Sequence, residues 1–153
     1  MKKYLPLIVI ISVSILAGLS ISWTKFNLLN VMHSSMGVFL LFFASLKLFD
    51  LNGFANGFQK YDLLAKRSRL YAMCYPFLEL ALSLGYLSGG GFMVYLATLL
   101  LMGFGALGVL SALKQGLDTR CACLGTALSV PLSTVAVVEN VGMVLMATLM
   151  ISI

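Results

Sequence analysis

Charged residues are scarce in this sequence. They make up 10% of its 153 residues, whereas about 25% is typical of soluble proteins. Hydrophobic residues make up 61%, which is more apolar surface than a soluble domain of this length can bury. The low charge also excludes a disordered chain and a nucleic-acid-binding protein. The composition therefore predicts an integral membrane protein, and the lipid bilayer is its first expected partner.

Cysteine is rare as well. Cys74, Cys121 and Cys123 are too few for a disulfide scaffold, although they could supply one redox pair or one metal site. The sequence has no P-loop, no H-E-x-x-H and no G-x-S-x-G motif. A G-x-G-x-x-G match at residues 103–108 lies inside an apolar run, where glycines favour close helix packing over dinucleotide binding.

Long apolar runs dominate the chain. A membrane-spanning helix needs about 20 mostly apolar residues. Five windows meet or nearly meet this length: Tyr4–Ser22, Val31–Phe49, Leu70–Leu87, Phe92–Leu113 and Pro131–Ile151. We therefore predict an all-α membrane bundle of five transmembrane helices. Residues 1–30 form an N-terminal helix with an outer loop, and residues 31–153 form a four-helix bundle.

The first window also has features of a signal peptide. Lys2 and Lys3 precede its apolar stretch, and the small residues Ser20 and Ser22 follow at a spacing that suits cleavage. The apolar run is long for a signal peptide. We therefore expect an uncleaved transmembrane helix.

The lysine and arginine residues predict the orientation. With the N-terminus in the cytoplasm, all ten basic residues except Lys25 lie at or near the inner face. We expect a multi-pass protein of the bacterial inner membrane with its C-terminus outside. In the loop at residues 50–69, apolar side chains recur at helical spacing and predict a short interfacial helix: Phe54, Phe58, Tyr61, Leu64 and Ala65.

The strongest local motif is Cys121-Ala122-Cys123-Leu124-Gly125. Two thiols separated by one residue can form a strained disulfide, which is easily reduced and suits exchange. The same thiolates could instead bind a soft metal such as Cu(I) or Zn. Arg120 favours a thiolate at its neighbour, and Gly125 permits a tight turn. Two inert interfacial cysteines are the third interpretation.

Two acidic residues lie inside predicted spans. Ionisable groups at such positions are costly and usually face the bundle interior. Glu79 and Glu139 lie about 14 Å and about 12 Å from the inner ends of their spans, and the long side chain of Lys47 could reach toward them. We predict a polar pocket in the inner half of the bundle, close to Cys121 and Cys123. In the alternative, each carboxyl is protonated or hydrogen-bonded and only locks the helices together.

Three further residues are candidates for weaker sites. Cys74 lies one turn inside its span, where it could resolve a disulfide of the cysteine pair or be a buried small apolar residue. His33 and Met36 are one helical turn apart at the outer start of the second span. They could share one copper ion, or His33 could be an interfacial polar residue and Met36 apolar filler.

Several short motifs follow one another from the second span onward. They are Gly37-Val38-Phe39, Lys47-Leu48-Phe49-Asp50, Lys60-Tyr61-Asp62, Tyr75-Pro76-Phe77-Leu78-Glu79-Leu80, Cys121-Ala122-Cys123-Leu124-Gly125 and Glu139-Asn140. In their order they resemble the MauE family of methylamine-utilisation membrane proteins, within the DoxX-like group. The resemblance covers roughly residues 31–150.

The resemblance implies a four-helix membrane bundle that assists disulfide formation or thiol redox during maturation of a partner enzyme, often beside a thioredoxin-like protein. It implies that Cys121 and Cys123 are the redox pair, and it places these motif residues around them: Lys47, Tyr61, Pro76 and Glu79. The sequence departs from the family pattern in its extra N-terminal span and in Ala122, where glycine is more usual.

The sequence thus predicts a membrane thiol–disulfide protein that exchanges electrons with a partner dithiol or a quinone-like acceptor. The alternative is a protein for transport or handling of Cu or Hg. It would use the three cysteines, with His33 and Met36 as an outer relay. An assembly scaffold without chemistry is the third possibility. The sequence identifies no cofactor, physiological partner or oligomeric state.

Overall fold

The computed structural model describes residues 4–60, 62–114 and 132–153. These residues form helices without any strand, and their bounds are α1 Leu5–Ile21, η2 (a 3-10 turn) Trp23–Lys25, α2 Leu28–Phe49, α3 Leu51–Phe58, α4 Arg69–Leu87, α5 Phe92–Lys114 and α6 Leu132–Ser152. The predicted all-α membrane bundle is confirmed. Within the described ranges, four helices are long and apolar enough to cross a membrane, namely α2, α4, α5 and α6. α1 is shorter, with 17 residues, at the lower limit for a span.

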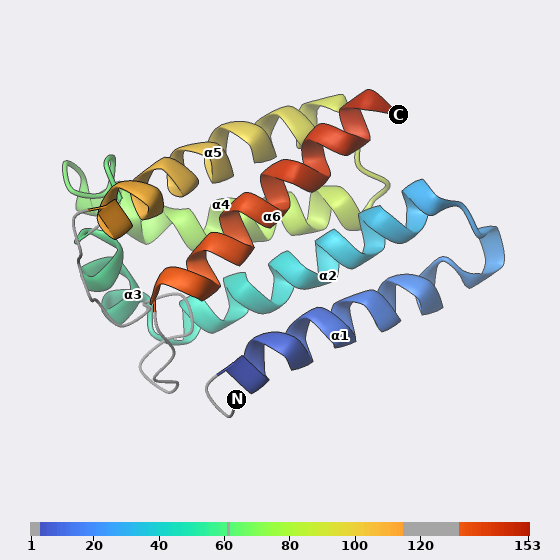
Figure 1. Cartoon of the computed structure of the whole chain (residues 1–153), viewed down its shortest axis with the longest axis horizontal. Coiled ribbons are helices and arrows are strands. Elements are labelled where there is room, and N and C mark those ends of the chain that lie inside the picture. The colour runs from blue at the N-terminus through green and yellow to red at the C-terminus, as the bar shows by residue number, and fades with distance from the viewer. Residues whose placement is uncertain (1–3, 61, 115–131) are drawn as a thin grey trace.

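The long helices run along the bundle in alternating directions (Figure 1). The most extensive packing joins α2 to α4, α5 to α6 and α1 to α2. α3 lies at one end of the bundle, where α2 and α5 end and α4 and α6 begin (Figure 1). We call this the α3 end. The connections from α1 to α2 and from α4 to α5 lie at the opposite end (Figure 1).

α1 packs on α2 through a stripe of small residues. Ser14, Gly18 and Ser22 are spaced four residues apart and are all buried. A Cβ atom added to Gly18 would lie 2.0 Å from the Oγ of Ser35, so glycine allows the two backbones to approach closely. Small residues at this spacing are typical of helix pairs in membranes. The N-terminal helix is therefore a packed part of the bundle.

Side-chain caps set the starts of three helices. The side chain of Asn27 accepts a hydrogen bond from the N–H of Leu29 at the start of α2. Asp50 caps α3 and Ser68 caps α4 in the same way. These bonds satisfy N–H groups that the first turn of a helix leaves without an intrahelical partner.

The predicted interfacial helix is α3, and it is shorter than the apolar spacing suggests. It ends at Phe58, and residues 63–67 form turns. Asp62 explains the turns, because its Oδ1 atom accepts hydrogen bonds from the N–H groups of Leu64 and Ala65 at 2.9 and 2.8 Å. Such bonds compete with helix formation. Within α3, Phe54 and Phe58 are buried against the bundle.

Candidate functional site

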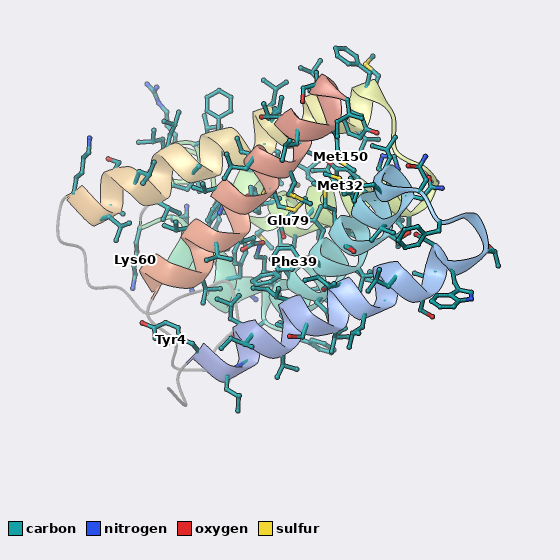
Figure 2. The ribbon with its side chains drawn as sticks, turned by 45° about the vertical axis from the view of Figure 1, so that its right-hand side comes forward. Tyr4, Met32, Phe39, Lys60, Glu79 and Met150 are labelled. Carbon is teal, nitrogen blue, oxygen red and sulfur yellow. The ribbon has the colours of Figure 1, made fainter. Side chains whose placement is uncertain are left out.

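A buried lysine joins three helices near the α3 end. Lys47 lies in the last turn of α2 and is 1% exposed. Its Nζ atom donates hydrogen bonds to Oε1 of Glu79 on α4 and to Oε1 of Glu139 on α6, both at 2.5 Å. Figure 2 shows Glu79 among the side chains of the bundle interior. We call Lys47, Glu79 and Glu139 the ion-pair triad.

Helical periodicity explains why these charged residues point inward. Lys47 lies three and seven residues after Ala44 and Leu40, on the stripe of α2 that faces the core. Glu79 and Glu139 occupy the equivalent stripes of their own helices. The buried neighbours on those stripes are Ala72, Tyr75, Leu82, Val135, Ala136 and Met143. The apolar stripes therefore bury one charged residue each, and the three meet at the same depth.

Aromatic rings surround the ammonium group of the triad. The Lys47 Nζ atom lies 5.7 Å from the ring centre of Phe43, 5.6 Å from that of Phe54 and 5.4 Å from that of Tyr75. Cations are attracted to the faces of such rings. Phe54 belongs to α3, so the short helix closes the site at its end of the bundle. The rings stabilise the charge of Lys47 and exclude water from it.

Each glutamate of the triad uses only one oxygen atom. The Oε2 atoms of Glu79 and Glu139 are buried, and neither has a hydrogen-bond partner among the described residues. Two carboxylates and one ammonium group carry a net negative charge when all three are ionised. Buried charges need partners, and a buried acceptor without one is unfavourable. The triad therefore has both the charge and the acceptor atoms to bind a further proton or hydrogen-bond donor.

A neutral layer lies next to the triad. The hydroxyl of Tyr75 is 3.3 Å from Oδ1 of Asn140, and the amide of Asn140 donates to the carbonyl of Ala136 at 2.9 Å. A Cβ atom on Gly105 would lie 2.4 Å from the same Oδ1 atom. Glycine therefore leaves room for the Asn140 and Tyr75 side chains where α5 approaches this layer. Tyr75 lies four residues before Glu79, and Asn140 directly follows Glu139.

A second polar cluster lies toward the opposite end of the bundle. His33 is 6% exposed, and its Nε2 atom is hydrogen-bonded to the hydroxyl of Tyr95. The hydroxyl of Tyr86 donates to Oγ1 of Thr98 at 3.0 Å, and both tyrosine rings pack near the histidine ring. We call these four residues the histidine cluster. Its histidine is about 21 Å from Lys47 along α2, for a rise of about 1.5 Å per residue.

The polar pocket expected from the sequence has four members, and the structure brings three of them together. Lys47, Glu79 and Glu139 form the triad, whereas Tyr61 lies outside the described residues. Sequence reasoning gave no role in the pocket to Phe54, Tyr75 and Asn140. The spacing could have indicated two of these residues, because Tyr75 lies one helical turn before Glu79 on the same face of α4 and Asn140 is adjacent to Glu139.

The candidate cysteine site lies mostly outside the described residues. Arg120, Cys121, Cys123 and Gly125 all belong to that part of the chain. Cys74 is described, and its side chain is exposed on the surface of α4. The interpretation of Cys74 as a buried small apolar residue is therefore wrong. Cys74 lies one residue before Tyr75, and a helix turns by about 100° per residue, so Cys74 leaves the buried stripe.

The predicted copper site of His33 and Met36 stays a prediction. Both residues are buried on the same helix, and one imidazole nitrogen of His33 is already hydrogen-bonded to Tyr95. Within the described ranges, no group of three or more histidine, cysteine, aspartate or glutamate side chains is arranged to hold a metal ion.

Residues 25–153 match the model of the family described as methylamine utilisation protein MauE. The chain belongs to the MauE family. The matched region begins after α1 and includes all three residues of the triad. Comparisons with curated proteins and with solved structures give no match.

Proposed function

We propose that this member of the MauE family is an accessory membrane protein of methylamine utilisation that exchanges disulfides with a partner during the partner's maturation. The partner is the maturing enzyme or a thioredoxin-like protein. The observation that carries this proposal is the family match over residues 25–153 combined with the Cys121-Ala122-Cys123 motif inside it.

The expected chemistry is a balanced exchange between two cysteine pairs. A thiolate of the partner attacks one sulfur of the Cys121–Cys123 disulfide and forms a mixed disulfide. The second thiolate of the partner then attacks the mixed disulfide. The products are a disulfide in the partner and two reduced thiols at Cys121 and Cys123, so two electrons pass to the cysteine pair and the thiol protons follow them.

The arrangement of the helix ends supports this proposal. Cys121 and Cys123 lie in the sequence between Lys114, where α5 ends, and Leu132, where α6 begins. Both helix ends lie at the α3 end (Figure 1), where α2 carries Lys47 in its last turn. Exposed basic side chains also gather there: Lys60, Lys66, Arg67, Arg69 and Lys114. Positive charge favours thiolates, which are the reactive form of cysteine.

Under the positive-inside rule, the same basic side chains favour a cytoplasmic α3 end. A disulfide is short-lived in that compartment, which suits a pair that is oxidised and reduced in turn. A C-terminal reporter that is active only in the cytoplasm should stay inactive, because α6 ends at the opposite end of the bundle. An active reporter would reverse the orientation.

The proposal is tested by trapping the mixed disulfide. Cys121→Ser and Cys123→Ser are each incubated with a thioredoxin variant that lacks its resolving cysteine and carries an activated remaining cysteine. At least one of them should give a covalent complex that a reductant dissolves on a gel. Both variants are made in a Cys74→Ser background, because the exposed thiol of Cys74 would otherwise react with the activated cysteine as well.

The decisive measurement is exchange by the oxidised wild-type protein. We expect it to oxidise reduced thioredoxin, and we expect Cys74→Ser to do so at the same rate. The proposal is wrong if the wild-type protein exchanges with no dithiol partner. It is also wrong if Cys74→Ser loses as much activity as the two other variants.

A further inference from the structure

We propose that the ion-pair triad is a proton-binding site that holds one proton between Glu79 and Glu139 while Lys47 stays charged. Its ligand is a proton, and no step of the proposed disulfide exchange requires it. The proposal goes beyond the proposed function, because it rests on the contacts of three buried side chains and not on the cysteines.

The first argument is the charge of the site. One ammonium and two carboxylates leave one uncompensated negative charge in the interior of a membrane bundle, which is strongly unfavourable. Among the described residues, the ion pairs of Glu79 and Glu139 are those with Lys47. In the part of the chain that the structure describes, Phe54, Tyr75 and Asn140 lie beside the triad on α3, α4 and α6 and carry no charge. The titratable Tyr71 of α4 is within electrostatic reach of Glu79. One proton on one carboxyl makes the site neutral.

The second argument is the geometry of the oxygen atoms. The Oε2 atoms of Glu79 and Glu139 are buried without a partner among the described residues. A protonated carboxyl is a hydrogen-bond donor, whereas a carboxylate only accepts. The two carboxyl groups interact with one another as well as with the ammonium group. A proton on one carboxyl therefore supplies a donor beside a second carboxyl that interacts with it.

The third argument decides which group carries the proton. Neutral lysine would make the site more negative, and it would lose its cation–π contacts with the ring faces of Phe43, Phe54 and Tyr75. It would also leave both glutamates as adjacent unpaired anions. The rings and the two carboxyls together favour the ammonium form, so the proton belongs to the glutamate pair.

Infrared difference spectroscopy of the full-length protein in lipid nanodiscs tests the proposal directly. At neutral pH, the wild-type protein should show a carboxylic-acid C=O band that shifts in D2O. Glu79→Gln and Glu139→Gln should each abolish this band, because one lysine and one glutamate are neutral without a further proton. Asp50→Asn is the control that should retain it, since Asp50 caps α3 outside the triad.

The wild-type spectrum alone can overturn the proposal, whether or not the variants fold. The absence of a carboxylic-acid band at neutral pH would mean that both glutamates are ionised. A band that survives both glutamine substitutions and disappears in Asp62→Asn would assign the proton to Asp62 and would also refute the proposal. The Cys121→Ser/Cys123→Ser double variant should keep the band, so a failure of the disulfide function leaves this result unchanged.

Discussion

The histidine cluster and the ion-pair triad both join helices through buried polar side chains, but they do so with different kinds of interaction. The histidine cluster joins α2 to α4 and α5 with neutral groups, and nearby Ser83 donates a hydrogen bond to the carbonyl of Gly37 at 2.7 Å. The ion-pair triad joins α2 to α4 and α6 with three ionisable groups. A neutral hydrogen bond therefore joins α2 to α4 beside the histidine cluster, and an ion pair joins them in the triad. Under the proton-binding proposal, the charges of the triad have a role beyond helix packing.

The loops beside the two clusters also differ in their content of charged residues. The connection from α4 to α5 contains three glycines with positive φ angles and no charged residue. Gly90, with φ of +66°, lies so close to the histidine ring that an added Cβ atom would be 2.4 Å from Nε2 of His33. The loop therefore covers the histidine tightly. At the α3 end the connections are longer and carry the exposed basic side chains, so charge is concentrated near the triad.

Removing Lys47 should give the largest loss of stability and would show most clearly how the triad differs from the histidine cluster. Lys47→Met leaves two buried carboxyls without their cation, which we expect to reduce the free energy of unfolding by about 3–5 kcal/mol. Denaturant titration in detergent measures this loss. Lys60→Met is the matched control, because Lys60 is exposed and a surface substitution changes stability by only about 0.5 kcal/mol. Equal losses in the two variants would contradict the importance of the triad.

The second-largest loss of stability should come from a substitution in the neutral layer beside the triad. Gly105→Ala places a Cβ atom 2.4 Å from Oδ1 of Asn140, so the Asn140 side chain must shift and strain its hydrogen bonds, which we expect to cost about 1–3 kcal/mol. Gly103→Ala is an informative control on the same helix. An added Cβ atom there meets no atom within 4 Å, and alanine favours a helix over glycine. Thermal unfolding should therefore rank Gly103→Ala at or above the wild type and Gly105→Ala below it.

Much of this fold follows from residue patterns within single segments. The apolar windows predict α2, α4, α5 and α6 to within a few residues, because a span is determined by local composition. The pocket was also accessible to sequence reasoning. Glu79 and Glu139 lie at similar depth in their spans, and Lys47 is long enough to reach them. Their meeting depends on depth and on inward orientation, which helical spacing determines.

Other features depend on contacts that no local pattern records. The apolar spacing after Phe58 continues to suggest a helix, yet α3 ends at Phe58 and the side chain of Asp62 accepts hydrogen bonds from N–H groups in the turns that follow. The closure of the triad by Phe54 requires α3 to fold back over α2 and α4. Cys74 shows the limit of composition arguments, because one helical step from the buried Tyr75 exposes it.

The histidine cluster should respond less strongly than the triad, because it holds no net charge to expose. Tyr95→Phe removes the hydroxyl that contacts Nε2 of His33, and we expect a loss of about 1 kcal/mol. Tyr86→Phe should lose less, because Oγ1 of Thr98 keeps its hydrogen bond to the carbonyl of Val94 at 2.8 Å. Denaturant titration of both variants checks this order. If Tyr95→Phe lost as much unfolding free energy as Lys47→Met, the expectation that the triad contributes more to stability than the histidine cluster would be wrong.

The smallest expected effect concerns Asp62, a buried acid at the α3 end that lies outside the spans. Burial raises the pKa of this carboxyl above its ordinary value of 3.8, although the N–H groups of Ala65 and Leu64 and the charge of Lys66 oppose the shift. The folded protein therefore binds the proton of Asp62 more tightly than the unfolded chain does. The free energy of unfolding should therefore fall as the pH rises from the pKa of Asp62 in the unfolded chain to its pKa in the folded protein. At pH values below both of these pKa values, Asp62 is protonated in both states and the loss is absent.

Asp62→Asn should flatten that part of the pH profile, because the amide does not titrate and its oxygen can still accept the backbone hydrogen bonds. The measurement is the difference in unfolding free energy between the two proteins at successive pH values upward from 3.8. A profile in which the wild type gains stability over the variant as the pH rises would mean that the hydrogen bonds outweigh burial. We expect this pH-dependent change in unfolding free energy to be smaller than the loss in Lys47→Met. Asp62 is a single buried acid with backbone partners, whereas Glu79 and Glu139 share one cation.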